Sequence, residues 1–333
     1  MGGSRILGTG HYLPDRVVTN FDLMKVMETS NEFIVERTGI EKRRYADPEL
    51  GTSDLAERAC RAALDDAGLA ADQIDLVVMN TLTPDHYNPG CAFFLQPKLG
   101  LTGIPVFDTK QNCAALIYGL SLADHYVSAG TYRHVLVVCA EINSKFVDTS
   151  NEGRNLSALV GDGAGAVVVG PSDDAARRIE SVILHADGSG AKHLCTVAPG
   201  WAGGRTRHLT HDDVEAGRIY ERMDGRFVFE NGVAKMTGVM LELLEANSLT
   251  IDDVDLIIPH QPNLRMLEEI ARRSRFPQEK FFINVVEHGN MASATTPIAL
   301  DQARKQGRFG DGDRILLVAF GAGFSWGAAL VRM

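Results

Sequence analysis

Apolar residues follow two alternating patterns along the chain. Residues 53–67 place small and apolar side chains at helical spacing between a Thr-Ser-Asp start and a Gly-Leu stop, which predicts an amphipathic helix. Residues 74–79 follow as a short, mostly apolar run that predicts a buried strand. Similar runs at 134–138 and 314–318 also alternate with helical segments. This alternation predicts an α/β protein whose largely parallel or mixed sheet is covered on both faces.

An internal repeat organises these elements. Residues 63–80 align with residues 243–260, which lie 180 positions later, and identical pairs include Leu64/Leu244, Leu69/Leu249, Asp72/Asp252, Asp75/Asp255 and Leu76/Leu256. The same offset pairs 134–138 with 314–318 without a gap. We therefore expect two similarly folded halves, each built as helix, strand, helix, strand, that pack into a layered α/β/α/β/α arrangement.

The repeat divides the chain into three parts. We expect an N-terminal half at 1–174, a C-terminal half at 231–333, and a loop-rich insertion over a cleft at 175–230, where hydrophobicity is low. The uncharged stretch 315–331 approaches the length of a membrane span, but glycines interrupt it and charged residues flank it. Two buried strands joined by a glycine turn fit it better, so no membrane association is expected.

Composition excludes several classes of function. The chain has 33 Lys+Arg against 43 Asp+Glu, a net charge of −10, which gives no basic surface for a phosphate backbone, so nucleic-acid binding is not expected. Its five cysteines are scattered without a Cys-x-x-Cys pair, which predicts neither a disulfide framework nor a metal site. The first residues lack the apolar core of a secretory signal, and we expect a cytoplasmic protein.

Cys113 is the candidate nucleophile. It follows a short strand end and precedes a helical run of small residues, which places its sulfur at a helix N-terminus. Unpaired N–H groups and the helix dipole favour a thiolate there. Position alone does not establish catalysis, because most free cysteines are small buried hydrophobic residues, as we expect of the other four.

Two polar residues in the C-terminal half are candidate partners of this cysteine. His260 ends a predicted strand at the repeat position that Asn80 holds in the first half, and Asn290 lies in a His-Gly-Asn turn before a second helical run of small residues. A neutral His and an Asn can hydrogen-bond a thioester carbonyl or an enolate, and the His can exchange protons. A solvated loop His and a turn-forming Asn are the alternatives.

Two glycine clusters do not match nucleotide-binding loops. GDGAG at 161–165 lacks the Lys-Ser/Thr end of a phosphate loop and leads into an apolar run, so we expect a tight turn. GTG at 8–10 lacks the further glycine of a dinucleotide fingerprint.

Several motifs together resemble the β-ketoacyl-acyl carrier protein synthase III family of the thiolase superfamily. They are NCAALIYGL from Asn112, VGDGAGAVVV from Val160, PHQPNLR from Pro259, HGNMASATTP from His288 and FGAGFSWGAALV from Phe320. The N-terminal segments GTGHYLPDRVVTN and EFIVERTGI extend the resemblance over nearly the whole chain. It implies a thiolase-like duplicated fold, and the family's Cys-His-Asn triad maps onto Cys113, His260 and Asn290.

The resemblance implies a ping-pong condensation that needs no cofactor. Cys113 would take an acyl group from acyl-CoA. A malonyl thioester on acyl carrier protein would then lose carbon dioxide and attack the acyl-cysteine, which gives a β-ketoacyl product and initiates fatty-acid-type synthesis. His260 and Asn290 would stabilise the enolate. The N–H groups of Cys113 and the turn at Ala322 would hold the thioester oxygen, and Phe320 resembles the family's gating aromatic.

The chain also departs from the family pattern. The family's adenine clamp, a Trp and an Arg, corresponds to Phe33 and Glu152, so a guanidinium–aromatic clamp is not expected, although Arg37 and Arg154 remain as cations for CoA. The turn reads Gly-Ala-Gly where three glycines are usual, and Asn112 stands where Ala is common. The sequences GRNLSALVGDGAG and HQPNLR also resemble synthases of alkylquinolone and other specialised pathways, so a function in a specialised pathway remains open.

The resemblance further implies partners. It implies a homodimer in which Tyr87 closes the acyl pocket of the second subunit. Arg265 matches the family's carrier-protein docking arginine and Arg272 adds charge, although both could belong to a solvated helix face balanced by Glu268 and Glu269.

Two rival functions remain open. One is an acyltransferase or thioesterase that uses the same acyl-cysteine without decarboxylation, and the other is an inactive partner subunit. The presence of the His–Asn pair argues against the first, and the presence of Cys113 argues against the second.

Overall fold

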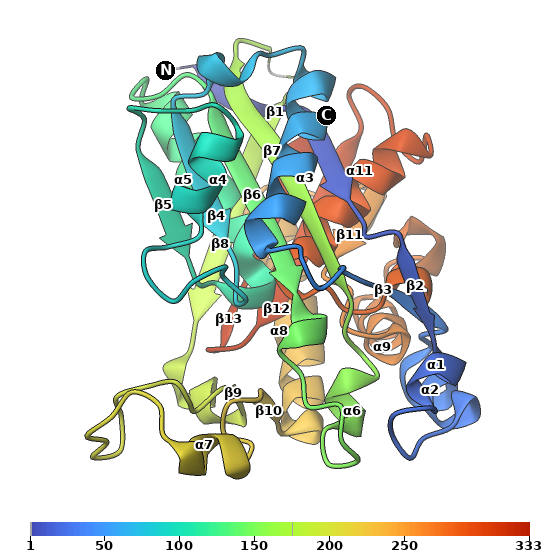
Figure 1. Cartoon of the computed structure of the whole chain (residues 1–333). Helices are drawn as coiled ribbons and strands as arrows, with labels where there is room; N and C mark the ends of the chain where they lie inside the picture. Colours follow the sequence, from blue (N-terminus) through green and yellow to red (C-terminus); the bar gives the residue numbers. More distant parts are fainter. Residues whose placement is uncertain (1, 175) are drawn as a thin grey trace.

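The computed structural model describes residues 2–174 and 176–333 and contains two central sheets (Figure 1). The N-terminal sheet has the order β1-β7-β6-β4-β5. Its strands are β1 (Gly3–Tyr12), β4 (Leu76–Asn80), β5 (Val106–Thr109), β6 (Val135–Ile142) and β7 (Asp162–Ser172). Strands β5, β4 and β6 are parallel, whereas β7 and β1 are antiparallel to their neighbours. The predicted mixed sheet is confirmed.

The C-terminal sheet repeats this arrangement. Its order is β11-β12-β13-β8, with β8 (Arg178–Ala186), β11 (Leu256–Pro259), β12 (Arg314–Gly321) and β13 (Ser325–Arg332). Strands β11 and β12 are parallel, and the two pairings that follow are antiparallel. A single parallel bridge from Ile257 to Phe281 occupies the place that β5 has in the first sheet. The predicted duplication therefore extends to strand order and direction.

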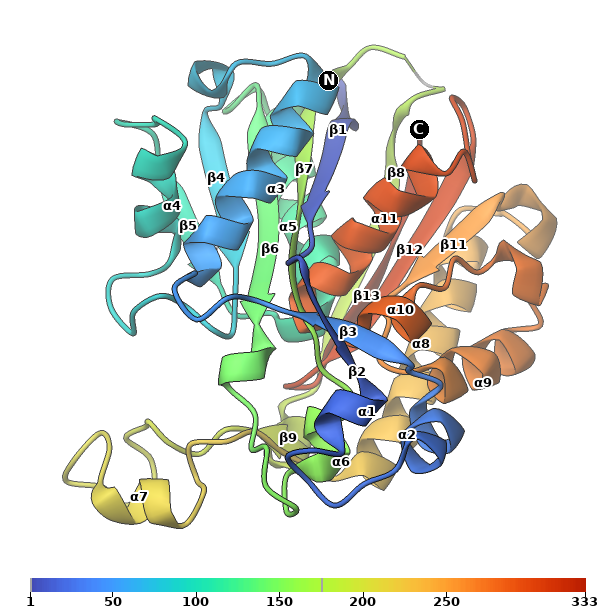
Figure 2. The same cartoon turned by 45° about the vertical axis from the view of Figure 1, so that its right-hand side comes forward.

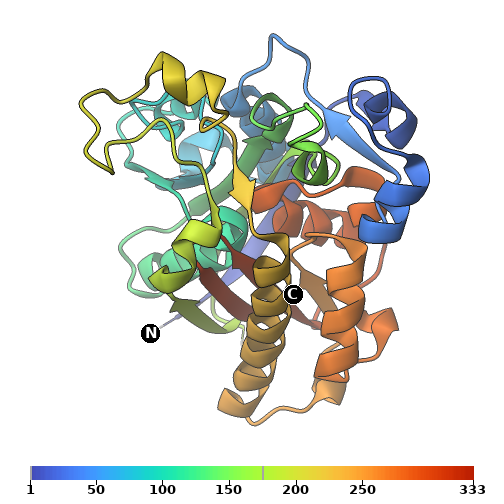
Figure 3. The same ribbon diagram turned by 90° about the horizontal axis from the view of Figure 1, so that it is seen from below.

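Helices complete five layers. Helices α3 (Thr52–Ala67) and α4 (Ala92–Lys98) cover the outer face of the first sheet, and α8 (Gly225–Ala246) and α9 (Leu264–Ser274) cover that of the second. Helices α5 (Ala115–Ser128) and α11 (Thr295–Lys305) lie between the sheets in one shared apolar core (Figure 2). Figure 3 shows α8 and α9 side by side on the outside. The predicted α/β/α/β/α layering is confirmed.

The two halves also share an unusual backbone conformation where their central helices begin. One 3-10 turn, η2 (Asn112–Ala114), leads into α5, and another, η7 (Ala292–Ala294), leads into α11. Their first residues lie 180 positions apart, and both have positive φ, 50° at Asn112 and 45° at Ala292. The two central helices thus begin in the same way.

Smaller elements surround the layers. Strands β2 (Arg16–Thr19) and β3 (Lys42–Tyr45) pair beside α1 (Asn20–Leu23), α2 (Asn31–Thr38), α6 (Arg154–Ser157) and α10 (Val285–His288). Strands β9 (Leu194–Cys195) and β10 (Arg222–Met223) pair at the base of an excursion that contains α7 (His211–Glu215) and projects at the lower left of Figures 1 and 2. Further 3-10 turns are η1 (Ala71–Gln73), η3 (Asn143–Lys145), η4 (Gly188–His193), η5 (Ile251–Asp253) and η6 (Gln278–Lys280).

The structure corrects two expectations and confirms a third. The loop-rich insertion predicted at 175–230 is shorter, because β8 pairs with β13 and α8 begins at Gly225. The tight turn predicted at GDGAG is wrong, because Gly163 and Gly165 lie within β7, where a Cβ on Gly165 would stand 2.8 Å from the backbone nitrogen of Ile298 in α11. The stretch 315–331 forms the β12–β13 hairpin as predicted. Among the helices that the structure describes, none has the length and apolar character needed to cross a membrane.

Candidate active site

Cys113, His260 and Asn290 line one cavity of about 110 Å³ between the two halves. Cys113 lies in η2 just before α5, His260 directly follows β11, and Asn290 lies in the turn between α10 and η7. The sequence analysis selected these three residues from positions far apart in the chain, and the structure brings them together. Across the described ranges, no group of three His, Cys, Asp or Glu side chains could hold a metal ion.

The thiol of Cys113 differs from the expected resting thiolate. Burial raises its pKa above the usual value, the negative charges of Glu221 and Glu141 raise it further, and the backbone N–H lowers it. Burial and the two carboxylates therefore favour the thiol over the expected thiolate. Of the other cysteines, Cys195 is partly exposed, so the expectation that all four are buried is wrong for this one.

His260 is a neutral base held in one orientation. Burial lowers its pKa to about 3, so the ring carries no charge near neutral pH. Its Nδ1 lies 2.6 Å from Oγ1 of Thr295, and that hydroxyl donates to the carbonyl of Ala292 at 2.9 Å. While the hydroxyl proton points to Ala292, Nδ1–H is the donor and Nε2 keeps a lone pair that can accept a proton; when the hydroxyl turns its proton to Nδ1, the ring proton lies on Nε2.

The side chain of Asn290 is oriented by the backbone around it. Its Oδ1 accepts a hydrogen bond of 2.8 Å from the N–H of Ala292, while its main chain bonds to Leu159 (2.7 Å) and Gly161 (3.0 Å). No acceptor for Nδ2 occurs in the part of the chain that the structure describes. The amide NH₂ is therefore a donor available to a molecule in the cavity.

Two backbone N–H groups form a second set of donors beside Cys113. Ala322 follows β12, and neither its N–H nor that of Cys113 has a carbonyl acceptor among residues 2–174 and 176–333. A Cβ on Gly321 would stand 2.8 Å from the nitrogen of Cys113, so glycine keeps this space open. Phe320 lines the cavity, with its ring centroid 4.7 Å from that of Phe324.

Three of the predicted CoA-binding residues form a cluster. The guanidinium carbons of Arg37 and Arg154 lie 4.7 and 5.7 Å from the centroid of the Phe33 ring, within cation–π range. Arg154 approaches this ring from a position two residues after Glu152, so the aromatic ring has cations beside it although the family's Trp and Arg are replaced.

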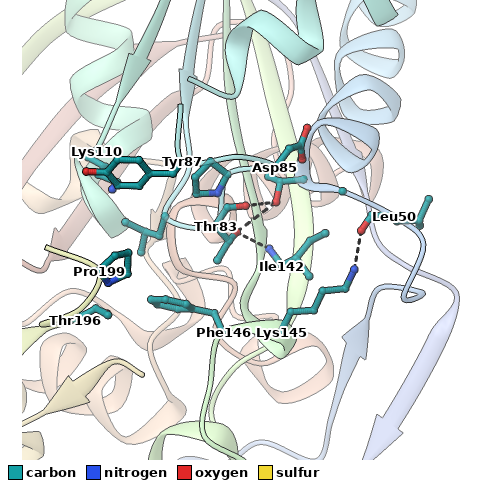
Figure 4. A pocket seen from close by; sticks show the side chains of 14 residues that line it. Leu50, Thr83, Asp85, Tyr87, Lys110, Ile142, Lys145, Phe146, Thr196 and Pro199 are labelled. Atoms are coloured by element: carbon teal, nitrogen blue, oxygen red, sulfur yellow. Dashed lines mark hydrogen bonds between the residues drawn. The ribbon is translucent and has the colours of Figure 1, made fainter. Parts of the chain in front are cut away.

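Tyr87 does not line the catalytic cavity. Its side chain is 68% exposed and borders a neighbouring pocket of about 500 Å³. Figure 4 shows Tyr87 beside Lys110 at one end of this pocket. At the other end, Nζ of Lys145 donates to the carbonyl of Leu50 at 2.8 Å. Leu82 lines both hollows and separates them.

The two docking arginines differ in their contacts. Arg265 donates to the carbonyl of Glu36 at 2.9 Å and pairs with Glu268 at 3.2 Å, which ties α9 to α2. Arg272 has a side chain that is 70% exposed and pairs with Glu269 at 2.7 Å. Both arginines are therefore partly neutralised by carboxylates on their own helix.

Two further residues at the site, Glu221 and Thr295, were not predicted from the sequence, and the contact made by a third, Asn112, was not predicted either. Glu221 lines the catalytic cavity, and burial raises its pKa to about 7. Thr295 orients His260, and Asn112 donates from Nδ2 to the carbonyl of Ala322 at 3.0 Å. No local pattern marks Glu221 or Thr295, whereas Asn112 was visible as an unusual residue before the cysteine.

Comparison with known proteins identifies the family. The family models "3-Oxoacyl-[acyl-carrier-protein (ACP)] synthase III" and its C-terminal counterpart match residues 107–188 and 244–333. The chain is 42% identical over 327 residues to a β-ketoacyl-[acyl-carrier-protein] synthase III of Caldanaerobacter subterraneus, which covers 98% of this chain and 97% of that protein. The Thiobacillus denitrificans synthase III is also 42% identical, with 99% of each chain covered.

Solved structures agree with this assignment. The 3-oxoacyl-[acyl-carrier-protein] synthase III of Aquifex aeolicus superposes with a TM-score of 0.89 at 39% identity and covers 99% of this chain and 100% of its own. The priming β-ketosynthase of the R1128 polyketide pathway superposes with a TM-score of 0.88 at 34% identity over 98% and 95% of the two chains. The fold is the predicted thiolase-like duplicated fold, and the chain belongs to the 3-oxoacyl-[acyl-carrier-protein] synthase III family.

Proposed function

We propose that this protein condenses an acyl-CoA with a malonyl thioester, with loss of carbon dioxide, to give a β-ketoacyl product. The observation that carries this proposal is that Cys113, His260 and Asn290 share one cavity and present to it a thiol, an imidazole nitrogen and an amide NH₂. These are the groups that acyl transfer and enolate stabilisation require. Membership of an acyltransferase family supports the same reaction.

In the first half-reaction the thiol of Cys113 loses its proton to Nε2 of His260 as the sulfur attacks the acyl carbonyl. The N–H groups of Cys113 and Ala322 hold the oxygen that becomes negative. When the carbonyl forms again, the bond to the CoA sulfur breaks and the CoA thiolate takes the proton from His260. An acyl-cysteine and free CoA result.

In the second half-reaction the malonyl carboxylate leaves as carbon dioxide, and its bonding electrons move into the thioester to give an enolate. The amide of Asn290 donates to the enolate oxygen. The hydroxyl of Thr295 can also donate to Nδ1, in which case His260 carries its proton on Nε2 and becomes a second donor. The carbanion then attacks the acyl carbonyl, the C–S bond breaks, and Cys113 takes up a proton.

The walls of the cavity support an apolar acyl chain and a CoA donor. Apart from the catalytic groups, the lining is largely aliphatic and aromatic, with Leu156, Leu159, Val228, Met266 and Phe320. Phe33 with Arg37 and Arg154 offers an aromatic face and two cations for the adenine and phosphates of CoA. Acyl-CoA is a cytoplasmic metabolite, and we propose that the protein acts there without a cofactor.

A homodimer is the proposed assembly. β5 is an edge strand of the first sheet, and exposed aromatic rings lie near it. Trp201 is 64% exposed, and the ring of His208 contacts both Trp201 and Tyr87. Exposed apolar side chains next to a free strand edge favour burial against a second copy. Tyr87 of the partner subunit would then close the acyl pocket beyond Leu82. Sedimentation tests the dimer, and Tyr87→Gly should shift chain-length preference.

Acyl carrier protein is the proposed carrier of the malonyl group, docked at Arg265 and Arg272. Arg272→Glu is the cleaner test, because Arg265 also holds α2. It should raise the KM for malonyl-carrier protein and leave acylation from a CoA thioester unchanged, whereas Arg226→Glu, on a fully solvated part of α8, should change neither. An equal effect of both substitutions would exclude this docking site.

The reaction itself is tested by mass spectrometry of the intact protein. A panel of acyl-CoA thioesters should add an acyl mass to Cys113, and malonyl-carrier protein should then remove it as a β-ketoacyl product. Loss of the acyl group to water or to another acceptor without carbon dioxide release would identify a thioesterase or simple acyltransferase. Similarity to a polyketide priming synthase keeps a specialised pathway as the second candidate, which the preferred acyl group and carrier protein would decide.

A further inference from the structure

Asn112 connects the nucleophile to the turn that follows β12. Its Nδ2 donates to the carbonyl of Ala322 at 3.0 Å, and the only other donor to this carbonyl within the described ranges is the hydroxyl of Ser325 at the longer distance of 3.4 Å. Cys113 is the next residue after Asn112. The bond therefore joins Ala322 to the residue before Cys113, and neither Cys113 nor Ala322 has a carbonyl acceptor for its N–H within the described ranges.

The backbone conformation alone does not explain why an asparagine stands here. Asn112 has φ 50°, in the left-handed region that Asn tolerates better than most residues. However, Ala292 has φ 45° at the equivalent position of the second half and carries only a methyl group. The amide of Asn112 must therefore be explained by its contact.

The second half joins the same two structural positions in another way. There the hydroxyl of Ser293, the counterpart of Cys113, donates to the carboxyl of Glu141, which is the counterpart of Gly321. Cys113 and Gly321 form no such bond, because the sulfur faces the cavity and the glycine has no side chain. The equivalent hydrogen bond is instead formed by the neighbouring residues, Asn112 before Cys113 and Ala322 after Gly321.

We propose that Asn112 is a positioning residue that fixes the turn at Ala322 relative to Cys113, so that the two N–H groups are spaced to hold the thioester oxygen. This inference rests on the proposed function, because it assumes acyl transfer to Cys113. Displacing one donor of such a pair slows acyl transfer without changing the attacking sulfur.

The test compares two reactions of the same sulfur in the full-length protein. Acylation by a saturating acyl-CoA passes through an oxyanion, whereas alkylation by iodoacetamide does not. Asn112→Ala and Asn112→Gly should both slow acylation of Cys113 by about 10- to 100-fold and should change its alkylation by less than about twofold. Peptide mapping by mass spectrometry separates Cys113 from the partly exposed Cys195.

Glycine suits the left-handed conformation, so Asn112→Gly keeps the backbone while it removes the amide. Ser248→Gly is the matched control, because Ser248 also has positive φ (54°) but lies at the exposed end of α8, and it should not affect acylation.

Normal acylation in Asn112→Gly would overturn the proposal, since only the backbone would then matter. Equal loss of acylation and alkylation in both variants would also overturn it, because Asn112 would then act on the thiol or on folding. Failure of the unaltered protein to become acylated would count instead against the proposed function.

Discussion

The two halves of this protein have nearly the same backbone and use it differently. Asn80, the last residue of β4, and His260, which directly follows β11, occupy equivalent positions. The Oδ1 of Asn80 is used within the protein, where it accepts from the N–H of Gln111 at 2.8 Å, whereas His260 is anchored through Nδ1 and keeps Nε2 for the cavity. A duplicated backbone thus supplies two equivalent positions, and side-chain contacts decide which of them does chemistry.

The same contrast holds where the central helices begin. Ser293 is fully buried and bonds to Glu141, while its counterpart Cys113 lines the cavity. Ser293 therefore forms a hydrogen bond between the two halves, whereas Cys113 faces the cavity, where a substrate can bind. The following predictions test this division of roles.

The largest effect is expected from exchanging the two junction residues. Cys113→Ser should lower acyl-enzyme formation by roughly 10³-fold or more, because a serine hydroxyl is a much weaker nucleophile here. The double variant Cys113→Ser with Ser293→Cys should remain equally inactive, because residue 293 does not reach the cavity. Mass spectrometry after exposure to acyl-CoA measures both, and recovery in the double variant would show that the junctions are interchangeable.

The partners of Cys113 should separate the two half-reactions. Asn290→Ala should still be acylated but should lose decarboxylation by about 10²- to 10⁴-fold, since its amide acts on the enolate. His260→Ala should slow both steps, because its Nε2 also takes the proton of the resting thiol. Carbon dioxide release and acyl-enzyme mass report the two steps, with His125→Ala on the exposed side of α5 as a control. Normal decarboxylation in Asn290→Ala would contradict the assignment.

Glu141 should make stability depend on pH. Burial raises its pKa from 4.5 to about 7, against hydrogen bonds from Ser293, Leu82 and neighbouring threonines. Since the unfolded chain loses this proton first, the contribution of Glu141 to the free energy of unfolding is complete below pH 4.5 and falls as pH rises to about 7. Glu141→Gln should lack this fall, so the difference in melting temperature between the unaltered protein and the variant should change between pH 4.5 and about 7. Parallel profiles would show that the carboxyl is ionised throughout.

The smallest effect concerns Glu221. Above pH 7 its carboxylate is charged and raises the pKa of Cys113, so Glu221→Gln should speed iodoacetamide alkylation of Cys113 at pH 8 by about threefold, equivalent to half a pKa unit. Below pH 6 the difference should vanish. Glu152→Gln, an exposed carboxyl in the adjoining outer cleft, should have no effect at either pH. An unchanged rate at pH 8 would separate Glu221 from the nucleophile.

Sequence alone determined the duplication, the strand and helix pattern, and the three residues that meet in the cavity. These features depend on local signals, namely hydrophobic spacing, glycine turns, and a cysteine, a histidine and an asparagine placed next to element ends. The structure extends the offset of 180 residues to the turns at Asn112 and Ala292, where the two central helices begin. Short-range stereochemistry repeats wherever the sequence pattern repeats.

Only the tertiary structure decided the electrostatics and the contacts between distant segments. It placed Cys113 where burial and the carboxylates of Glu221 and Glu141 raise the pKa of the thiol. It also placed Arg154 against Phe33 and brought Asn112 to the carbonyl of Ala322. A pKa or a hydrogen bond depends on what surrounds a group in space, and more than one hundred residues separate Arg154 from Phe33 and Asn112 from Ala322 along the chain.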